Sequence, residues 1–342
     1  MHDNDKWLSQ VEESVIDPGL EIVDAHHHLG SFWPNPENSY TLDAFMADTG
    51  SGHNVVQSVF VQCGAAYRKD GPLEFRCVGE TEFVTHMAAL SAERYGTTIA
   101  GIVAAADLSS EQLDEVIEAH RAAGGELFCG IRESGAYEPD PSALSIPGPA
   151  EPRIFYSDDF RRGVARLGEL GLSFDTWVFH HQIQEFLDLA AAVPGTTMIL
   201  DHFGMPLGVG QYAGKRAEIF ARWKDDIAAL AECPNVYAKL GGLAMPDMGF
   251  GWDTSAKPPT SDEFLEAQGP WYEHAISSFG PKRCMFESNF PVDRQSLSYR
   301  VLFNGFKKIA AGYAAADREM MFSGVARQVY KLPPVANSQN GG

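Results

Sequence analysis

Eight short apolar segments recur along the chain and alternate with longer segments of helical character. Most of the apolar segments are near-continuous, which is typical of strands buried on both faces of a parallel sheet. We predict strands at 21–25, 55–63, 97–106, 126–132, 172–179, 196–201, 235–240 and 283–288. We predict helices at 79–95, 110–123, 157–170, 183–193, 214–232, 262–279 and 297–311. This alternation predicts an α/β fold, a single (β/α)8 TIM barrel.

A doubly wound open sheet is the alternative to the barrel. It is less favoured because no Gly-rich dinucleotide motif follows the first strand and the chain has no P-loop. We find no internal repeat and no dividing linker in the 342 residues. We therefore expect an N-terminal extension at 1–20, one barrel over 21–332 and a disordered tail at 333–342.

The charge balance and the cysteine pattern limit the partners. The chain has 46 acidic and 26 basic residues, a formal net charge of −20, which disfavours binding to nucleic acid. No uninterrupted apolar run is long enough for a membrane span, and the N-terminus lacks the apolar core of a secretory signal. Five scattered cysteines suit a reducing compartment. We expect a cytoplasmic protein whose partner is a small molecule.

Three long segments follow predicted strands, at 30–40, 133–156 and 241–260, and they are rich in Pro, Gly and aromatic residues. In a barrel these connections lie at the carboxyl ends of the strands, where active sites form. We predict that they cover a site, with surface decoration as the alternative. Exposed aromatics in segment 241–260 would also suit a homo-oligomer contact.

Histidines occur at the ends of three predicted strands. His26 and His28 end the first strand and point to the same side, because extended residues alternate faces. His180 and His181 follow the fifth strand, and His202 follows the sixth. A lone buried histidine is usually a hydrogen-bonded core residue, but placements from three strands at one rim favour a functional site.

Four segments together resemble the amidohydrolase superfamily, in particular the "amidohydrolase 2" branch that includes lactonases. They are Asp24–Leu29, Leu200–Gly204, Asn235–Leu243 and Met285–Pro291, and the resemblance spans about residues 22–330. It implies a (β/α)8 barrel and hydrolysis at a carbonyl, often that of a lactone. It also implies that His26, His28 and His202 are inward-facing site residues and that Arg132 anchors the substrate.

Asn289 stands where the family usually has an aspartate that binds metal or acts as a general base. An amide is a weaker ligand and cannot take a proton from water. Glu287, Asp293 and one of His180 and His181 are the candidate substitutes. Of these we favour Glu287 close to the reacting atoms and a histidine for proton transfer.

The three histidines His26, His28 and His202 would give a divalent metal, zinc first, three neutral ligands and leave a position open for water. Catalysis without metal is equally compatible with the sequence. In that case the histidines and Arg132 would polarise the carbonyl directly.

Further candidates for substrate binding lie near the same rim. Lys239, in an apolar strand, would pair with Glu287 or bind substrate. The aromatic candidates, which would otherwise only close the loops over the site, are Trp33, Trp177, Phe203 and Trp252. An aromatic pocket favours a ring-shaped or alkyl-bearing substrate over a heavily hydroxylated sugar.

The leading hypothesis is a hydrolase that adds water to the carbonyl of a small organic ester, most simply a lactone. His26 and His28 would polarise the carbonyl, and His180 or His202 would activate water. A metal-dependent non-oxidative decarboxylase of an aromatic or unsaturated acid is the alternative, since it needs no hydrolytic base. A non-catalytic small-molecule binding protein is the third.

Overall fold

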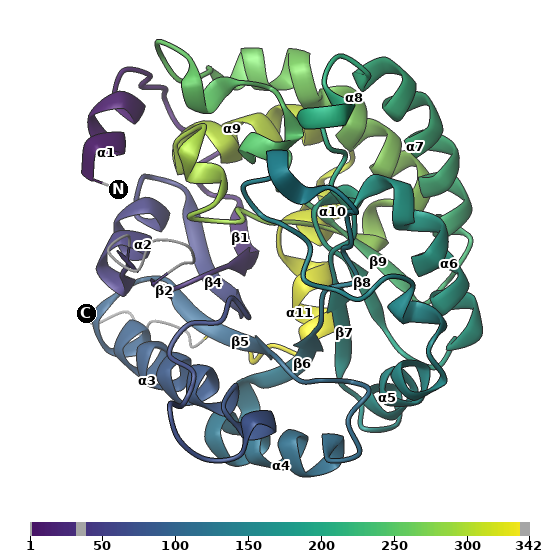
Figure 1. The fold of residues 1–342 in the computed structure, drawn as a ribbon. Coiled ribbons are helices and arrows are strands. Elements are labelled where there is room, and N and C mark those ends of the chain that lie inside the picture. The colour runs from purple at the N-terminus through teal and green to yellow at the C-terminus, as the bar shows by residue number, and fades with distance from the viewer. Residues whose placement is uncertain (1, 32–38, 336–342) are drawn as a thin grey trace.

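Eight parallel strands form the centre of the molecule and follow one another in chain order around a barrel (Figure 1). The structure, a computed structural model, describes residues 2–31 and 39–335. The strands are β1 (Glu21–His27), β4 (Asn54–Val61), β5 (Thr98–Ala104), β6 (Phe128–Arg132), β7 (Ser173–Thr176), β8 (Met198–Leu200), β9 (Val236–Leu240) and β10 (Cys284–Phe286). The predicted TIM barrel is confirmed. Trp33 and tail residues 336–342 lie outside the described residues.

The barrel closes between its first and last strands just beyond the end of β10. The amide of Asn289 donates to the carbonyl of His26 at 2.9 Å, and the amide of His28 donates to the carbonyl of Phe290 at 2.8 Å. These bonds place the residues that follow β10 beside the histidines of β1. A small antiparallel pair, β2 (Gly30–Ser31) and β3 (Ser39–Tyr40), lies beside the barrel.

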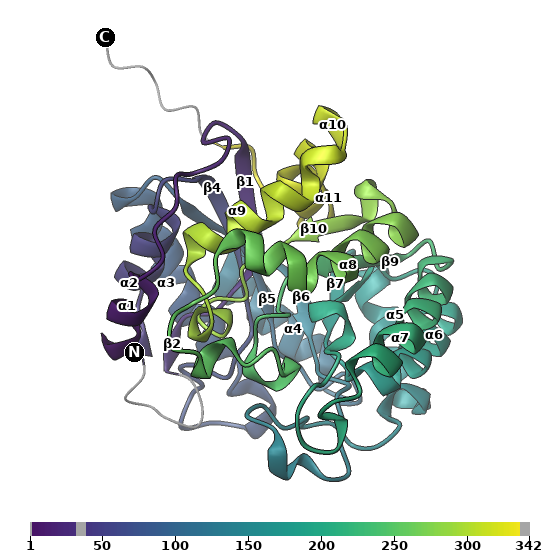
Figure 2. The same ribbon diagram turned by 90° about the horizontal axis from the view of Figure 1, so that it is seen from above.

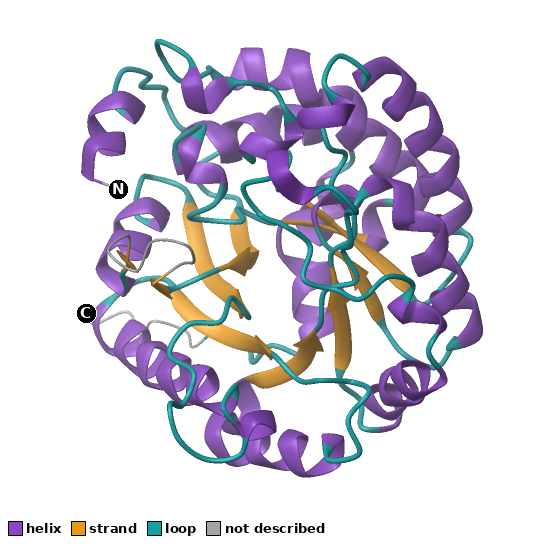
Figure 3. Cartoon of the chain, in the orientation of Figure 1, coloured by secondary structure: helices purple, strands orange, loops and turns teal. Residues whose placement is uncertain are grey.

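Helices surround the strands on the outside, as Figure 3 shows. In chain order they are α1 (His2–Leu8), α2 (Leu42–Thr49), α3 (Val78–Arg94), α4 (Leu113–Gly124), α5 (Asp158–Glu169), α6 (Ile183–Ala192), α7 (Arg216–Ala231), α8 (Ser261–Phe279), α9 (Tyr299–Ile309), α10 (Ala315–Glu319) and α11 (Val325–Tyr330). No helix within the described part of the chain is long and apolar enough to cross a bilayer.

Most helix boundaries agree with the sequence prediction, and the differences have local causes. The hydroxyl of Ser110 accepts from the amide of Gln112 in a tight turn, so α4 begins only at Leu113. Ser157 rather than Asp158 caps α5, because its hydroxyl accepts from the amide of Phe160. Helix α2, capped by Thr41, was not predicted.

The inside of the barrel has its own apolar core, which includes Val23, Val59 and Ile199 and is continued by Val325 and Tyr330 of α11. The C-terminal helix therefore closes the barrel at the amino ends of the strands. Figure 2 shows α10 and α11 at one end of the barrel and long connecting segments at the other. A site inside the barrel must accordingly open toward those connecting segments.

Candidate active site

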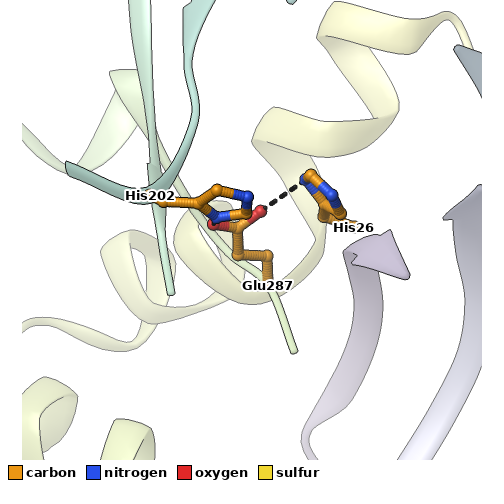
Figure 4. Close-up of side chains that lie close together, drawn as sticks. All are labelled: His26, His202 and Glu287. Atoms are coloured by element: carbon orange, nitrogen blue, oxygen red, sulfur yellow. Dashed lines mark hydrogen bonds and ion pairs between the residues drawn. The ribbon is translucent and has the colours of Figure 1, made fainter. Parts of the chain in front are cut away.

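Side chains from three strand ends meet in the barrel mouth (Figure 4). His26 lies near the end of β1, His202 follows β8 and Glu287 follows β10. All three are buried, and their potential ligand atoms lie within 4.8 Å of one another. Among the described residues this group differs from the predicted ligand set in having Glu287 where the prediction had His28.

The carboxylate of Glu287 joins two of the imidazole rings. Its Oε2 lies 2.9 Å from Nδ1 of His26, and its Oε1 lies 2.8 Å from Nδ1 of His202. An ionised carboxylate only accepts hydrogen bonds, so in that state Nδ1 of His202 carries the hydrogen. The contact with His26 is short but is not a hydrogen bond, since Oε2 has no hydrogen-bond partner among the described residues. The tautomer of His202 leaves its Nε2 lone pair available to a ligand or a proton.

His28 completes the histidine group from the same strand as His26. Its Nδ1 lies 2.7 Å from the carbonyl oxygen of Val61, which only accepts, so Nδ1 is the donor. The Nε2 atoms of His26 and His28 then face each other at 3.1 Å. Nε2 of His28 therefore accepts from Nε2 of His26, and Nδ1 of His26 accepts from Nζ of Lys239 at 3.3 Å.

The environment disfavours an additional proton on either ring. Burial, assisted by the charge of Lys239, lowers the pKa of His26 well below its usual value. Burial and the charge of Arg132 do the same to the pKa of His28. Burial also raises the pKa of Glu287 to about 8, and a nearby cation would favour its ionised form. Imidazole nitrogens and a carboxylate oxygen are zinc ligands, so the donor set fits a divalent metal.

A buried ionic network lies one layer deeper in the barrel. Nζ of Lys239 is 2.8 Å from Oδ2 of Asp175 and 3.0 Å from Oδ1 of Asp201. Tyr330 of α11 donates to the same Asp175 oxygen at 2.5 Å. Lys239 also lies 3.3 Å from Nδ1 of His26, so the network supports the histidine group from below.

The suggested pairing of Lys239 with Glu287 is wrong. The register of the two strands aligns Met285, not Glu287, with Lys239. Glu287 stands two residues further along, one layer nearer the mouth. Since side chains in one barrel layer come from alternate strands, Lys239 of β9 meets Asp175 of β7.

Two glycines after β9 make room for the cluster. A Cβ atom on Gly241 would lie 2.4 Å from Cγ of Glu287, and one on Gly242 would lie 2.6 Å from Nδ1 of His202. Gly242 also has φ +83°, which other residues rarely adopt. The consecutive glycines are thus a local requirement for the contact between His202 and Glu287.

Three residues at these strand ends have left-handed backbones although they are not glycine. They are His202 (φ 54°), Phe203 (φ 58°) and Asn289 (φ 53°). Such conformations are uncommon and concentrate at functional sites. Here they end β8 and β10 earlier than predicted and turn His202 and Asn289 toward the barrel mouth.

A cavity of about 80 Å³ lies against the cluster. Its lining is His28, Arg132, Ile146, Trp177, His202, Met205, Met245, Asn289 and Val292. The site prediction thus includes five of these side chains. Ile146, Met205, Met245 and Val292 were missed, because apolar residues in loops carry no chemical signal.

Arg132 is held at the cavity wall by Gln62. Its Nε donates to the Gln62 side-chain oxygen at 3.1 Å and its Nη2 to the Gln62 carbonyl, while its Nη1 lies 3.7 Å from Asp201. Glu133, the next residue in the chain, accepts from the amide of Leu108 at 2.8 Å and does not pair with Arg132. One edge of the guanidinium is therefore fixed by the protein.

Several predicted residues lie outside the cavity lining. Phe203 packs edge-on against Tyr272 in the core, and Trp252 stacks on Phe250. Nδ1 of His180 accepts from the amide of Leu207 at 3.3 Å, which makes this atom unsuited to receive a proton from water.

Asp293 lies behind Asn289 rather than in the lining. Its Oδ1 accepts from the side-chain Nδ2 of Asn289 at 3.0 Å, and its Oδ2 accepts from the backbone amide of Ala244 at 3.3 Å. Asp293 therefore orients Asn289 and turns the amide oxygen away from itself.

Asp175 and Asp201 were missed as members of the ionic network. Asp175 interrupts an apolar predicted strand and Asp201 precedes His202, so a buried acid at each position was a usable signal.

A larger, open depression of about 730 Å³ lies elsewhere, between α5 and the segment leading into β8. Its lining includes Arg161, Glu169 and Thr196 but no histidine. It adjoins the amino end of β8, opposite to the end where barrels place catalytic groups. We therefore assign the site to the smaller cavity.

The comparisons with known proteins agree with the barrel fold. The amidohydrolase family model matches residues 23–332. An uncharacterized protein, y4mH of Sinorhizobium fredii, is 30% identical over 92% of this chain and 99% of its own length. L-fucono-1,5-lactonase of Burkholderia multivorans is 29% identical over 76% of this chain and 79% of its own. A crystal structure of an amidohydrolase from Burkholderia multivorans with bound zinc has TM-score 0.72 and 26% identity, covering 91% of this chain and 99% of that one.

Proposed function

Because this chain belongs to the amidohydrolase family, we propose that it hydrolyses the carbonyl of a small organic ester, specifically a lactone. The observation that carries the proposal is the buried group of His26, His202 and Glu287 beside a cavity at the carboxyl ends of the strands. The relation to an L-fucono-1,5-lactonase supports a lactone as the ester.

His202 and Glu287 form the proton-transfer pair of this proposal. A water molecule gives its proton to Nε2 of His202 as its oxygen attacks the carbonyl carbon. Glu287, which accepts from Nδ1 at 2.8 Å, stabilises the imidazolium formed. The ring C–O bond then breaks, and the leaving alkoxide takes the proton from His202 to give a hydroxy acid.

Arg132 and Asn289 orient the substrate from the cavity walls. The guanidinium edge not used by Gln62 donates to an oxygen of the substrate. Burial lowers the pKa of His202 to about 3, so the imidazole is neutral at pH 7 and accepts a proton from water only with an ionised Glu287 to stabilise the imidazolium.

A divalent metal would take His26, His202 and Glu287 as ligands, and in that state His202 would not be the proton acceptor. Such a cation supplies a Lewis acid that polarises the carbonyl and lowers the pKa of bound water. The zinc-containing relative supports zinc as the metal.

Non-oxidative decarboxylation remains the second candidate function. One observation favours it: within the described residues, the cavity lining contains no carboxylate, and Asn289 cannot act as a base. The two functions differ in their products, since decarboxylation releases CO2 and hydrolysis releases a hydroxy acid.

Acid release from a panel of lactones, together with metal content by plasma mass spectrometry, tests the proposed function. We expect turnover by the wild type and at least about 100-fold lower kcat/KM in His26→Asn and His202→Asn. His274→Asn is the matched control, because His274 lies on α8 and bonds the carbonyl of Lys224 outside the cavity. Equal activity in all variants would contradict the assignment.

A further inference from the structure

The cavity has one chemically uniform side, which we call the apolar wall. It consists of Ile146, Trp177, Met205, Met245 and Val292. These residues come from the loops after five different strands, β6 to β10. The polar lining residues, in contrast, belong to the catalytic group or its immediate neighbours.

The apolar wall is fixed in position by a buried carboxylate from another loop. Asp247, in the loop after β9, accepts from the amides of Ser145 and Ile146 at 2.8 and 3.0 Å. The amide of Gly208, in the loop after β8, donates to the carbonyl of Asp247 at 2.9 Å. Three loops are therefore joined behind Ile146, and hydrogen bonds within the protein hold the wall in place.

Few groups on the polar side of the cavity are available to a substrate hydroxyl, because most already bind other parts of the protein. Nε and Nη2 of Arg132 donate to Gln62, and the side-chain Nδ2 of Asn289 donates to Asp293. His202 is committed to proton transfer in the proposed reaction. On the apolar wall the only side-chain hydrogen-bond donor is the indole N–H of Trp177. The methionine sulfurs there are only weak acceptors.

A substrate ring with several hydroxyl groups would bury some of them against this wall. A hydroxyl that leaves water without finding a partner is unfavourable, whereas methylene and methyl groups gain from the same burial. We propose that the substrate is a lactone whose ring faces the apolar wall with alkyl or methylene groups rather than hydroxyl groups. This inference rests on the proposed hydrolysis of a lactone.

One pair of six-membered lactones tests the inference directly. δ-Hexalactone and L-fucono-1,5-lactone share the ring and its methyl substituent, and only the second carries ring hydroxyls. With each kcat/KM divided by the uncatalysed rate constant, we expect δ-hexalactone to be preferred by about 10- to 100-fold. An equal value, or a preference for L-fucono-1,5-lactone, would overturn the inference while leaving the proposed function intact.

A wall variant shows whether the preference comes from these residues. Ile146→Asn places an amide on the apolar wall and should lower the preference for δ-hexalactone by about 10-fold or more. Ile154→Asn is the matched control, since Ile154 is in the same loop, equally half-buried, and outside the lining. An unchanged preference in Ile146→Asn would contradict a role for the wall.

Binding of lactams separates failure of the inference from failure of the proposed function. If neither of these nor any other lactone of the panel is hydrolysed, the proposed function is contradicted, and calorimetry compares 6-methylpiperidin-2-one with its trihydroxylated counterpart. Tighter binding of the methyl lactam would still support an apolar-facing ligand. Equal or tighter binding of the hydroxylated lactam would overturn the inference.

Discussion

Oε1 of Glu287 lies 2.8 Å from Nδ1 of His202, and its other oxygen lies 2.9 Å from Nδ1 of His26. One buried carboxylate thus contacts two histidines from different strands and sets the tautomer of His202. This relationship compensates for Asn289, which offers no charge and no base. The chain has its carboxylate two residues earlier, at Glu287, and this carboxylate acts through the imidazoles rather than directly on the substrate.

Replacing Glu287 with Gln should abolish most of the activity with little change in shape. The amide is neutral, so it no longer supplies the negative charge that stabilises the imidazolium of His202. We expect kcat/KM to fall by about 100-fold or more. Glu133→Gln is the control, because Glu133 is a largely buried carboxylate outside the cavity lining. Equal losses in both variants would indicate a general effect of removing buried charge.

Gly242→Ala should damage the site more than the fold. Both Gly242 (φ +83°) and Gly251 (φ +70°) have left-handed backbones, so either alanine should cost about 1–2 kcal/mol of stability. Only the Cβ on residue 242 meets His202, whereas nothing lies within 4 Å of one on residue 251. We therefore expect activity to fall in Gly242→Ala alone. Thermal unfolding and kcat/KM measured side by side would check this, and full activity in Gly242→Ala would contradict the role of the close contact.

Lys239→Met should destabilise the barrel strongly. It leaves Asp175 and Asp201 as buried acids without their cation, which typically costs about 3–5 kcal/mol. Lys308→Met removes a lysine whose partner Asp262 is exposed, and should cost less than about 1 kcal/mol. Urea unfolding of both variants tests the difference. Similar midpoints would show that the network contributes little to stability.

Glu133 should make the protein less stable as the pH rises. Burial raises the pKa of its carboxyl from the usual 4.5 to about 8, so between these values the folded chain holds a proton that the unfolded chain has lost. Unfolding then releases a proton, and stability falls with pH across this window by at most about 1.4 kcal/mol per unit from this group. Glu133→Gln should unfold at a higher temperature than the wild type near pH 8 and should lose this advantage toward pH 4.5. A difference in melting temperature that does not vary with pH would contradict this assignment.

The strands, most helices and the location of the site were predictable because their signals are local. Apolar runs reveal buried parallel strands, and His26, His28 and His202 end such runs. Glu287 was noticed for the same reason, as an acid inside an apolar strand end. The resemblance to the amidohydrolase superfamily added the order in which the site motifs follow one another along the chain.

The contacts between strands were not predictable in the same way. The pairing of Lys239 depends on the register between β9 and β10, which one-residue shifts would change entirely. Phe203 is turned out of the cavity by the left-handed backbone at 202–203, and His180 is held by hydrogen bonds with the backbone of Met205 and Leu207. Neither feature is visible in the sequence. Ile146 and Met245 reach the cavity only through loop contacts such as those of Asp247.

Hydrolysis of δ-hexalactone in ¹⁸O-labelled water by the wild type and by His202→Asn tests the central claim most directly. Mass spectrometry of the product should show one ¹⁸O atom in the carboxylate with the wild type. The same product should form at least about 100-fold more slowly with His202→Asn. No turnover of this or any other lactone by the wild type, or an undiminished rate in His202→Asn, would contradict a lactone hydrolase built on His202 and Glu287.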